Sequence, residues 1–224
     1  MEPAAVATVS VPHPLAPEDQ ARANFYALLA RLFAAAPDAA LLHAIAEAAP
    51  LGIAVDADPG ADTGEPEAAG PALPAAWDAL RAASAAMDPD AVIEEYNDLF
   101  VGVGKSEVNL HASHWLTGFM MEKPLVEVRT ALDRLGLARR AEASLLEDHL
   151  AALCETMRIL IAGHGARAPS PIAEQRAFFE RHIAPWVFAC CSATIDSSVA
   201  NYYRHVAQFA QRYMALERDS FAID

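Results

Sequence analysis

Apolar side chains recur every three or four residues through most of this chain, and this spacing constrains its fold more than any other feature. The clearest case is a helix predicted over residues 142–162. Its stripe consists of Leu146, His149, Leu150, Leu153, Met157, Leu160 and Ile161. Such a stripe is typical of a helix that buries one face. No segment shows the regular alternation that predicts a half-buried strand.

Prolines, glycines and capping residues divide the chain into further predicted helices. They begin near Glu18, at residue 39 behind the cap Asp38, at Pro74, at Pro89 behind the cap Asp88, near residue 110, at Pro124, after Pro171, and behind Asp196 or Ser197. The helix after Asp88 is expected to reach about Phe100, and Pro185 to kink or split the helix in which it lies. We therefore predict an all-α fold, a single-domain bundle of about nine or ten helices.

Residues 1–17, with four prolines and many small side chains, are predicted to be a disordered arm. Residues 18–219 are predicted to form the all-helical domain. Within it, residues 51–72 are rich in Asp, Gly and Pro and are predicted to be a flexible loop. A loop of this length could let the N-terminal helices exchange between subunits, so both a monomer and a homodimer fit the sequence.

The 224 residues carry a net charge of −14, which disfavours nucleic acid as a partner and suits a cationic one. The three cysteines Cys154, Cys190 and Cys191 are expected to be buried thiols in a reducing compartment. The first residues lack the pattern of a secretory signal, and no run of about 18 apolar residues predicts a membrane span. We expect a cytoplasmic protein without stable membrane insertion.

Histidines provide the strongest argument for metal binding or catalysis. His111 and His114 are three residues apart, and His149 follows Asp148. However, the chain has no HExxH motif, no repeated Glu-x-x-His pair and no GxSxG motif. Neighbours in a helix point about 100° apart, so Asp148 and His149 are not expected to pair there. We assign no metal, cofactor or catalytic residue. The alternative is an all-α metal-binding protein or enzyme that uses His111, His114 and His149.

Residues 94–119 favour a binding function. Glu94 and Asp98 are like charges at i,i+4, which costs about 0.2–0.5 kcal/mol unless a cation compensates. Large apolar residues flank the glycine-bearing loop that follows: Leu99, Phe100, Trp115, Leu116 and Phe119. Carboxylates beside an apolar groove would suit a peptide with paired arginines followed by a hydrophobic stretch. The alternative is a solvated acidic face over aromatic residues of the core.

Several short motifs, in this order, resemble one family. They are Tyr26, Leu29, Arg31, Leu32 and Phe33 with Pro37; Glu95 to Gly102 (Glu-Tyr-Asn-Asp-Leu-Phe-Val-Gly); Lys123-Pro124-Leu125 with Gly136; Glu147-Asp148-His149-Leu150; Phe178-Phe179 with His182 and Pro185-Trp186; and Tyr202-Tyr203-Arg204. Over residues 22–217 the chain resembles the TorD/DmsD family of redox-enzyme maturation chaperones, relatives of nitrate reductase delta-type assembly proteins. The run from Trp115 to Arg129 resembles the branch associated with formate dehydrogenases.

This resemblance implies a non-catalytic cytoplasmic chaperone. Such proteins bind the twin-arginine signal peptide, and sometimes the apoenzyme, of a molybdenum- or tungsten-cofactor oxidoreductase until the cofactor is inserted and export can follow. Carried over to this sequence, the binding residues are Tyr96, Leu99, Phe100, Trp115, Asp148 and His149. We expect the arginines to meet Asp148, Glu95 or Asp98 and the hydrophobic stretch to lie over Leu99, Phe100 and Trp115. Another possibility is an assembly subunit that stays with its client.

Overall fold

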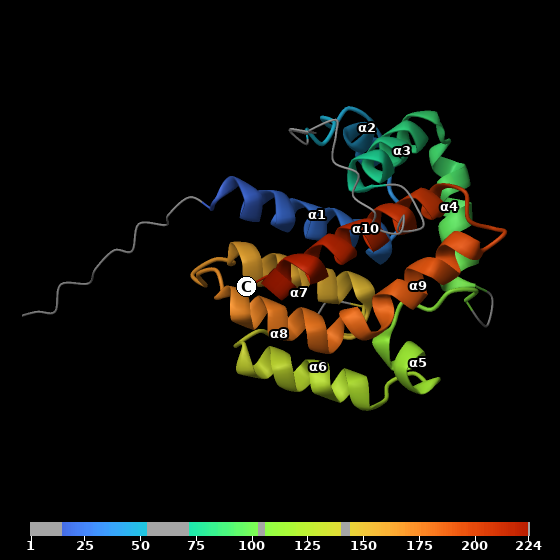
Figure 1. The fold of residues 1–224 in the computed structure, drawn as a ribbon. Coiled ribbons are helices and arrows are strands. Elements are labelled where there is room, and N and C mark those ends of the chain that lie inside the picture. The colour runs from blue at the N-terminus through green and yellow to red at the C-terminus, as the bar shows by residue number, and fades with distance from the viewer. Residues whose placement is uncertain (1–14, 53–71, 103–105, 140–143, 224) are drawn as a thin grey trace, which may run out of the picture.

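The computed structural model describes residues 15–52, 72–102, 106–139 and 144–223. These residues form ten α-helices and one π-helical turn, with no named strand among them (Figure 1). The prediction of an all-α, single-domain bundle of nine or ten helices is confirmed. Almost all of the predicted arm and of the predicted loop at 51–72 lies outside the described residues.

The described helices follow one another along the chain. They are α1 (Pro17–Ala34), α2 (Ala39–Ala46), α3 (Leu73–Ala86), α4 (Pro89–Tyr96), the π-helical turn (Asn97–Val101), α5 (Ala112–Thr117), α6 (Lys123–Arg134), α7 (Leu150–Ala162), α8 (Ile172–His182), α9 (Ala184–Asp196) and α10 (Tyr202–Ile223).

The last helix, α10, runs through the middle of the bundle. It packs against α3, α4, α8 and α9, while α1 lies along α7. Figure 1 shows α2 and α3 above α10, and α6 on the opposite side, beyond α8. The apolar stripe of α10 is buried at Tyr202, Tyr203, Val206, Phe209 and Tyr213, whereas Leu216 is 51 % exposed. All three cysteines are buried and unpaired.

Local sequence signals position several of these helices as predicted. Asp38 caps α2 by accepting a hydrogen bond of 2.7 Å from the backbone N–H of Leu41. Asp88 accepts hydrogen bonds from the first N–H groups of α4, which has proline in its first turn. The chain is divided just before Pro185, where α8 gives way to α9.

Two predicted helix starts are wrong. The helix expected over 142–162 begins only at Leu150, because the residue before it caps its N-terminus rather than continuing the apolar stripe. The last helix does not start behind Asp196 or Ser197, since α9 continues through Asp196 and Ser197 donates its hydroxyl to Glu107. It starts at Tyr202, whose backbone is capped from a distant part of the chain.

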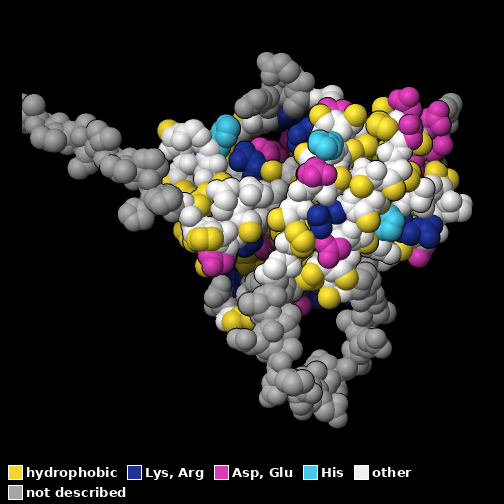
Figure 2. All heavy atoms as spheres, turned by 90° about the horizontal axis from the view of Figure 1, so that it is seen from above, with side chains coloured by type: hydrophobic (Ala, Val, Ile, Leu, Met, Phe, Trp, Pro, Cys, Tyr) yellow, Lys and Arg dark blue, Asp and Glu magenta, His cyan; other side chains and the backbone are white. Residues whose placement is uncertain are grey.

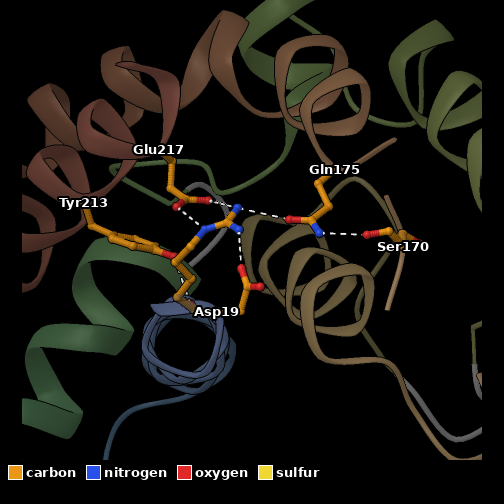
Figure 3. A network of polar contacts seen from close by, with 6 residues as sticks. Asp19, Ser170, Gln175, Tyr213 and Glu217 are labelled. Carbon is orange, nitrogen blue, oxygen red and sulfur yellow. Dashed lines mark hydrogen bonds and ion pairs between the residues drawn. The ribbon is translucent and has the colours of Figure 1, made fainter. Parts of the chain in front are cut away.

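A buried ion pair ties the first helix to the last (Figure 3). The Arg22 guanidinium donates to both carboxylate oxygens of Glu217, at 2.7 and 3.0 Å, and also to Gln175 on α8. The Tyr213 hydroxyl donates to the backbone carbonyl of Arg22 at 2.9 Å. Burial opposes the charge of Arg22, but the hydrogen bond and charge of Glu217 more than compensate and raise the pKa of Arg22. The pair therefore fixes α1 against α8 and α10.

Candidate functional site

The predicted binding motif includes a π-helical turn. The helix expected to continue to Phe100 widens after Tyr96, and the N–H of Gly102 donates to the carbonyl of Asn97, five residues earlier, at 2.7 Å. Such single turns often occur at functional sites. The turn buries Leu99 completely and leaves Val101 58 % exposed. A peptide therefore cannot lie directly on Leu99, contrary to the sequence expectation.

Tyr96 and Phe100 pack mainly against other aromatic residues. The Phe100 ring centroid lies 5.0 Å from that of Tyr203, 5.3 Å from that of Tyr96 and 6.2 Å from that of Phe33. The Tyr96 hydroxyl donates to the Phe33 carbonyl at 3.2 Å. Both side chains are half-buried. They join the π-helical turn to the end of α1 and the start of α10, and only part of each ring reaches solvent.

The Glu95 carboxylate points into the bundle and caps α10. Its oxygens accept hydrogen bonds from the backbone N–H groups of Asn201, Tyr202 and Tyr203 at 2.9, 2.9 and 2.7 Å. The residue is 7 % exposed. This differs from the expectation that Glu95 meets a client's arginines, because its oxygens already satisfy the first N–H groups of a helix.

Exposed carboxylates lie on the solvent-facing side of the same element. Asp90, Glu94 and Asp98 recur every four residues along α4 and the π-helical turn, and all three are exposed. Val101 and Ile93 add exposed apolar surface, with Ile93 40 % exposed. Figure 2 shows Asp and Glu side chains gathered on the side of the molecule where α4 lies in Figure 1. We call Asp90, Glu94 and Asp98 the acidic face. The sequence analysis missed Asp90, although the i,i+4 spacing pointed to it.

Asp148 is fully buried and holds the first turn of α5. Its Oδ2 accepts hydrogen bonds from the Ser113 backbone N–H at 2.9 Å and from the Ser113 hydroxyl at 2.6 Å. Nearby backbone bonds from Ala112 to Asp148 and from Leu150 to Leu110 pair the two segments as a short antiparallel bridge. Oδ1 has no hydrogen-bond partner in the described structure. Ser113 is itself fully buried and donates to a carboxylate, so it is not arranged as a nucleophile.

His149 caps α7. Its Nδ1 accepts a hydrogen bond of 3.1 Å from the backbone N–H of Ala151. Burial, followed by the nearby His111, lowers the pKa of His149 to about 3, so the ring is neutral near pH 7. Burial also lowers the pKa of His111, whose ring centroid lies 4.8 Å from that of His149.

The three histidines considered as metal ligands do not come together in one place. His111 and His149 touch each other, whereas the His114 ring lies edge-on to Trp115 at 6.0 Å. Within the described ranges, no group of three or more His, Cys, Asp or Glu residues is placed to hold a metal ion. The geometry therefore gives the metal-protein alternative no support in this part of the chain.

An exposed apolar surface follows Ser113 in the chain. Trp115 is half-buried and donates its Nε1–H to the Asn109 carbonyl at 2.6 Å. Beyond it, large apolar side chains point outward: Leu116 is 44 % exposed, Phe119 70 %, Met120 36 % and Met121 68 %. We call these four residues the apolar turn. In Figure 1 the turn between α5 and α6 lies at the lower edge of the molecule, toward the same end as α4. The chain reverses there at Gly118 (φ 84°) and Met121 (φ 57°).

A pocket of about 800 Å³ lies between α1, α7 and the segment after α6. Small side chains of α1 and α7, such as Ala30 and Ala151, form much of its wall, and Arg31, Arg139 and Arg158 also line it. The face seen in Figure 2 is hollowed near its upper edge, where Lys or Arg side chains lie beside Asp or Glu side chains. None of the residues predicted to bind the client lines this pocket.

The described residues thus form an all-helical fold with an exposed acidic face and an exposed apolar turn. Residues 67–192 match the family described as nitrate reductase delta subunit. The chain belongs to this family of molybdoenzyme maturation chaperones, which is related to TorD and DmsD. Comparison with curated proteins finds no similar sequence. None of the described helices has both the length and the apolar character required to cross a lipid bilayer.

Proposed function

We propose that this protein is a cytoplasmic chaperone that binds the twin-arginine signal peptide of a molybdenum or tungsten oxidoreductase. It would retain the apoenzyme until the cofactor is inserted and release it for export afterwards. Family membership supports the maturation role. The observation that carries the peptide-binding role is the apolar turn, in which four large side chains in a six-residue segment face solvent. Exposed apolar groups gathered in this way are typical of interaction sites.

The charge pattern favours a peptide with a cationic beginning and an apolar continuation. The chain carries a net charge of −14, and Glu94 and Asp98 of the acidic face are exposed. Guanidinium groups pair with carboxylates through two parallel hydrogen bonds, which a lysine cannot reproduce. We therefore assign the paired arginines to Glu94 and Asp98, in place of the buried Glu95 and Asp148.

The apolar stretch of the signal peptide is assigned to the apolar turn and the exposed edge of Trp115. Tyr96 and Phe100 support the π-helical turn from behind through their contacts with α1 and α10. His149 contributes by capping α7 beside the Asp148–Ser113 contact. This arrangement keeps most of the residues that the sequence resemblance implied, but gives the buried ones structural roles.

Titration calorimetry with a synthetic signal peptide tests the proposal, and a formate dehydrogenase peptide is the first choice because of the run from Trp115 to Arg129. We expect micromolar binding that falls about tenfold when both arginines become lysines. Glu94→Gln with Asp98→Asn should remove that preference. Matched controls are Asp133→Asn and Glu180→Gln, which change exposed carboxylates on other helices.

The apolar contribution is tested with Phe119→Ser and Met121→Ser in one variant. Because both side chains are mostly exposed, stability should stay within about 0.5 kcal/mol of wild type while peptide affinity falls at least tenfold. Leu216→Ser is the control, since Leu216 is 51 % exposed on α10. If no signal peptide binds the wild-type protein, this function is wrong. Co-purification with an exported mature enzyme would instead favour a lasting assembly subunit.

A further inference from the structure

We propose that Asp148 is a positioning residue for the client-binding surface: it fixes the apolar turn through Ser113 and does not itself touch the signal peptide. The inference rests on the proposed function and assigns a different task to a residue that the sequence analysis placed among those that meet the client's arginines. It follows from three observations on the segment from Ser113 to Glu122.

The first observation is a relay of hydrogen bonds that spans the apolar turn. Asp148 Oδ2 accepts from the N–H and the hydroxyl of Ser113, and Ser113 Oγ in turn accepts from the backbone N–H of Glu122 at 3.3 Å. Every residue of the apolar turn lies between Ser113 and Glu122. One buried carboxylate therefore holds the beginning of this segment directly and its end through the serine hydroxyl.

The second observation is that few tertiary hydrogen bonds hold the turn beyond Trp115, whose Nε1–H anchors the start of the segment to the Asn109 carbonyl. Inside the segment, the Thr117 hydroxyl donates to the Ser113 carbonyl at 2.8 Å, so this contact also depends on the position of Ser113. Asn109 donates to the Met120 sulfur at 3.5 Å. Leu116, Phe119 and Met121 are all at least 44 % exposed, so little apolar packing holds the turn against the bundle. Its conformation therefore depends strongly on the Asp148–Ser113 contact.

The third observation concerns access. Asp148 and Ser113 are both fully buried, and Asp148 lies within the bridge that pairs residues 110–112 with 148–150. Because Asp148 is 0 % exposed, an arginine could reach the unpartnered Oδ1 only after a local rearrangement. The competing hypothesis is that Oδ1 is kept free for such an arginine. The two hypotheses predict different effects of an Asp148 substitution on a twin-arginine peptide and on a twin-lysine peptide.

If Asp148 acts by position, its loss should weaken all peptides that use the apolar turn, whatever their cations. A looser turn must be ordered on binding, which reduces affinity without changing the preference between arginine and lysine. If Asp148 meets an arginine, its loss should weaken the twin-arginine peptide more than the twin-lysine peptide and so reduce the preference for arginine.

The experiment is a calorimetric titration of wild type, Asp148→Asn and Ser113→Ala with both peptides. We expect each variant to bind both peptides about tenfold more weakly, with the arginine-to-lysine affinity ratio within twofold of wild type. The double variant should lose little more than either single variant, because both substitutions break one relay. Glu217→Gln is the matched control: it also changes a buried carboxylate to an amide, but between α1 and α10, and peptide affinity should not change.

Amide hydrogen exchange tests the order of the apolar turn in the absence of peptide. Amides of residues 116–122 should exchange faster in Asp148→Asn and Ser113→Ala, but not in Glu217→Gln. The inference is overturned if Asp148→Asn abolishes the arginine preference while Ser113→Ala binds normally, or if neither variant changes affinity. If Asp148→Asn does not fold, Ser113→Ala alone decides, because a positioning relay requires that it weaken both peptides. If wild type binds neither peptide, the proposed function has failed.

Discussion

The carboxylate of Glu95 accepts a hydrogen bond of 2.7 Å from the backbone N–H of Tyr203, which lies 108 residues further along the chain. With the bonds from Asn201 and Tyr202, this contact gives α10 its N-terminal cap. The motif that contains Glu95, Tyr96 and Leu99 therefore serves partly to hold the core together. Only its outward-facing members remain for a partner.

Replacing Glu95 with alanine should destabilise the protein by at least about 2 kcal/mol, because it removes a helix cap and leaves buried N–H groups without an acceptor. Urea unfolding followed by circular dichroism measures the loss. Glu94→Ala is the matched control, since Glu94 is exposed, and should change stability by less than about 0.5 kcal/mol. Equal effects of the two substitutions would contradict the capping role.

The Arg22–Glu217 pair gives a second stability prediction. Their side chains are 19 % and 2 % exposed, so removing Glu217 leaves the part-buried Arg22 with only the more exposed Asp19 as a charged partner. Glu217→Leu should cost about 3–5 kcal/mol, and the double variant Arg22→Met with Glu217→Leu should be more stable than that single variant. Both side chains of the Arg218–Asp219 pair are exposed, so Asp219→Ala should lower the free energy of unfolding by no more than about 1 kcal/mol. A double variant less stable than Glu217→Leu would contradict this reasoning.

The fold could be predicted from the sequence because its signals are local. Asp38, Asp88 and Pro185 mark helix boundaries through neighbours within four residues, and the stripe of α10 depends only on helical spacing. Such features need no knowledge of which helices meet. The same holds for the exposed i,i+4 pair Glu94 and Asp98.

The site could be predicted only in part, because its geometry depends on distant contacts. Asp148 meets Ser113 across 35 positions, and no local pattern distinguishes a carboxylate that caps another helix from one that faces solvent. His149 fits an apolar stripe at helical spacing, yet its ring nitrogen caps α7 instead. The sequence resemblance points to segments of the chain, while the direction of each side chain depends on tertiary structure.

Gly163 ends α7 with a positive φ of 73°, and a side chain there would collide with the backbone carbonyl of Arg167. Gly163→Ala should therefore lower the free energy of unfolding by clearly more than the backbone strain alone would. Gly136→Ala is the control, because its φ is 65° but open space surrounds the new methyl group. We expect about 1–2 kcal/mol for Gly136→Ala and at least about 2 kcal/mol more for Gly163→Ala. Thermal and urea unfolding of the two variants would show whether the difference exists.

Buried neutral histidines should make the protein sensitive to mild acid. The pKa of His149 is lowered from 6.5 to about 3, and burial, followed by the charge of Arg181, lowers that of His182 to about 4. Below pH 6.5 the unfolded chain binds protons that the folded chain does not, so stability is full above this pH and falls as pH decreases toward 3. At pH 5, His149 alone should cost about 2 kcal/mol relative to neutral pH.

His149→Asn tests this dependence, because asparagine can cap α7 but does not titrate. The slope of unfolding free energy against pH near pH 5 should fall by about 1.4 kcal/mol per pH unit, the value for one proton. His43→Asn is the control, since His43 is exposed on α2 and should leave the slope nearly unchanged. Urea titrations from pH 4 to 7.5 supply the slopes.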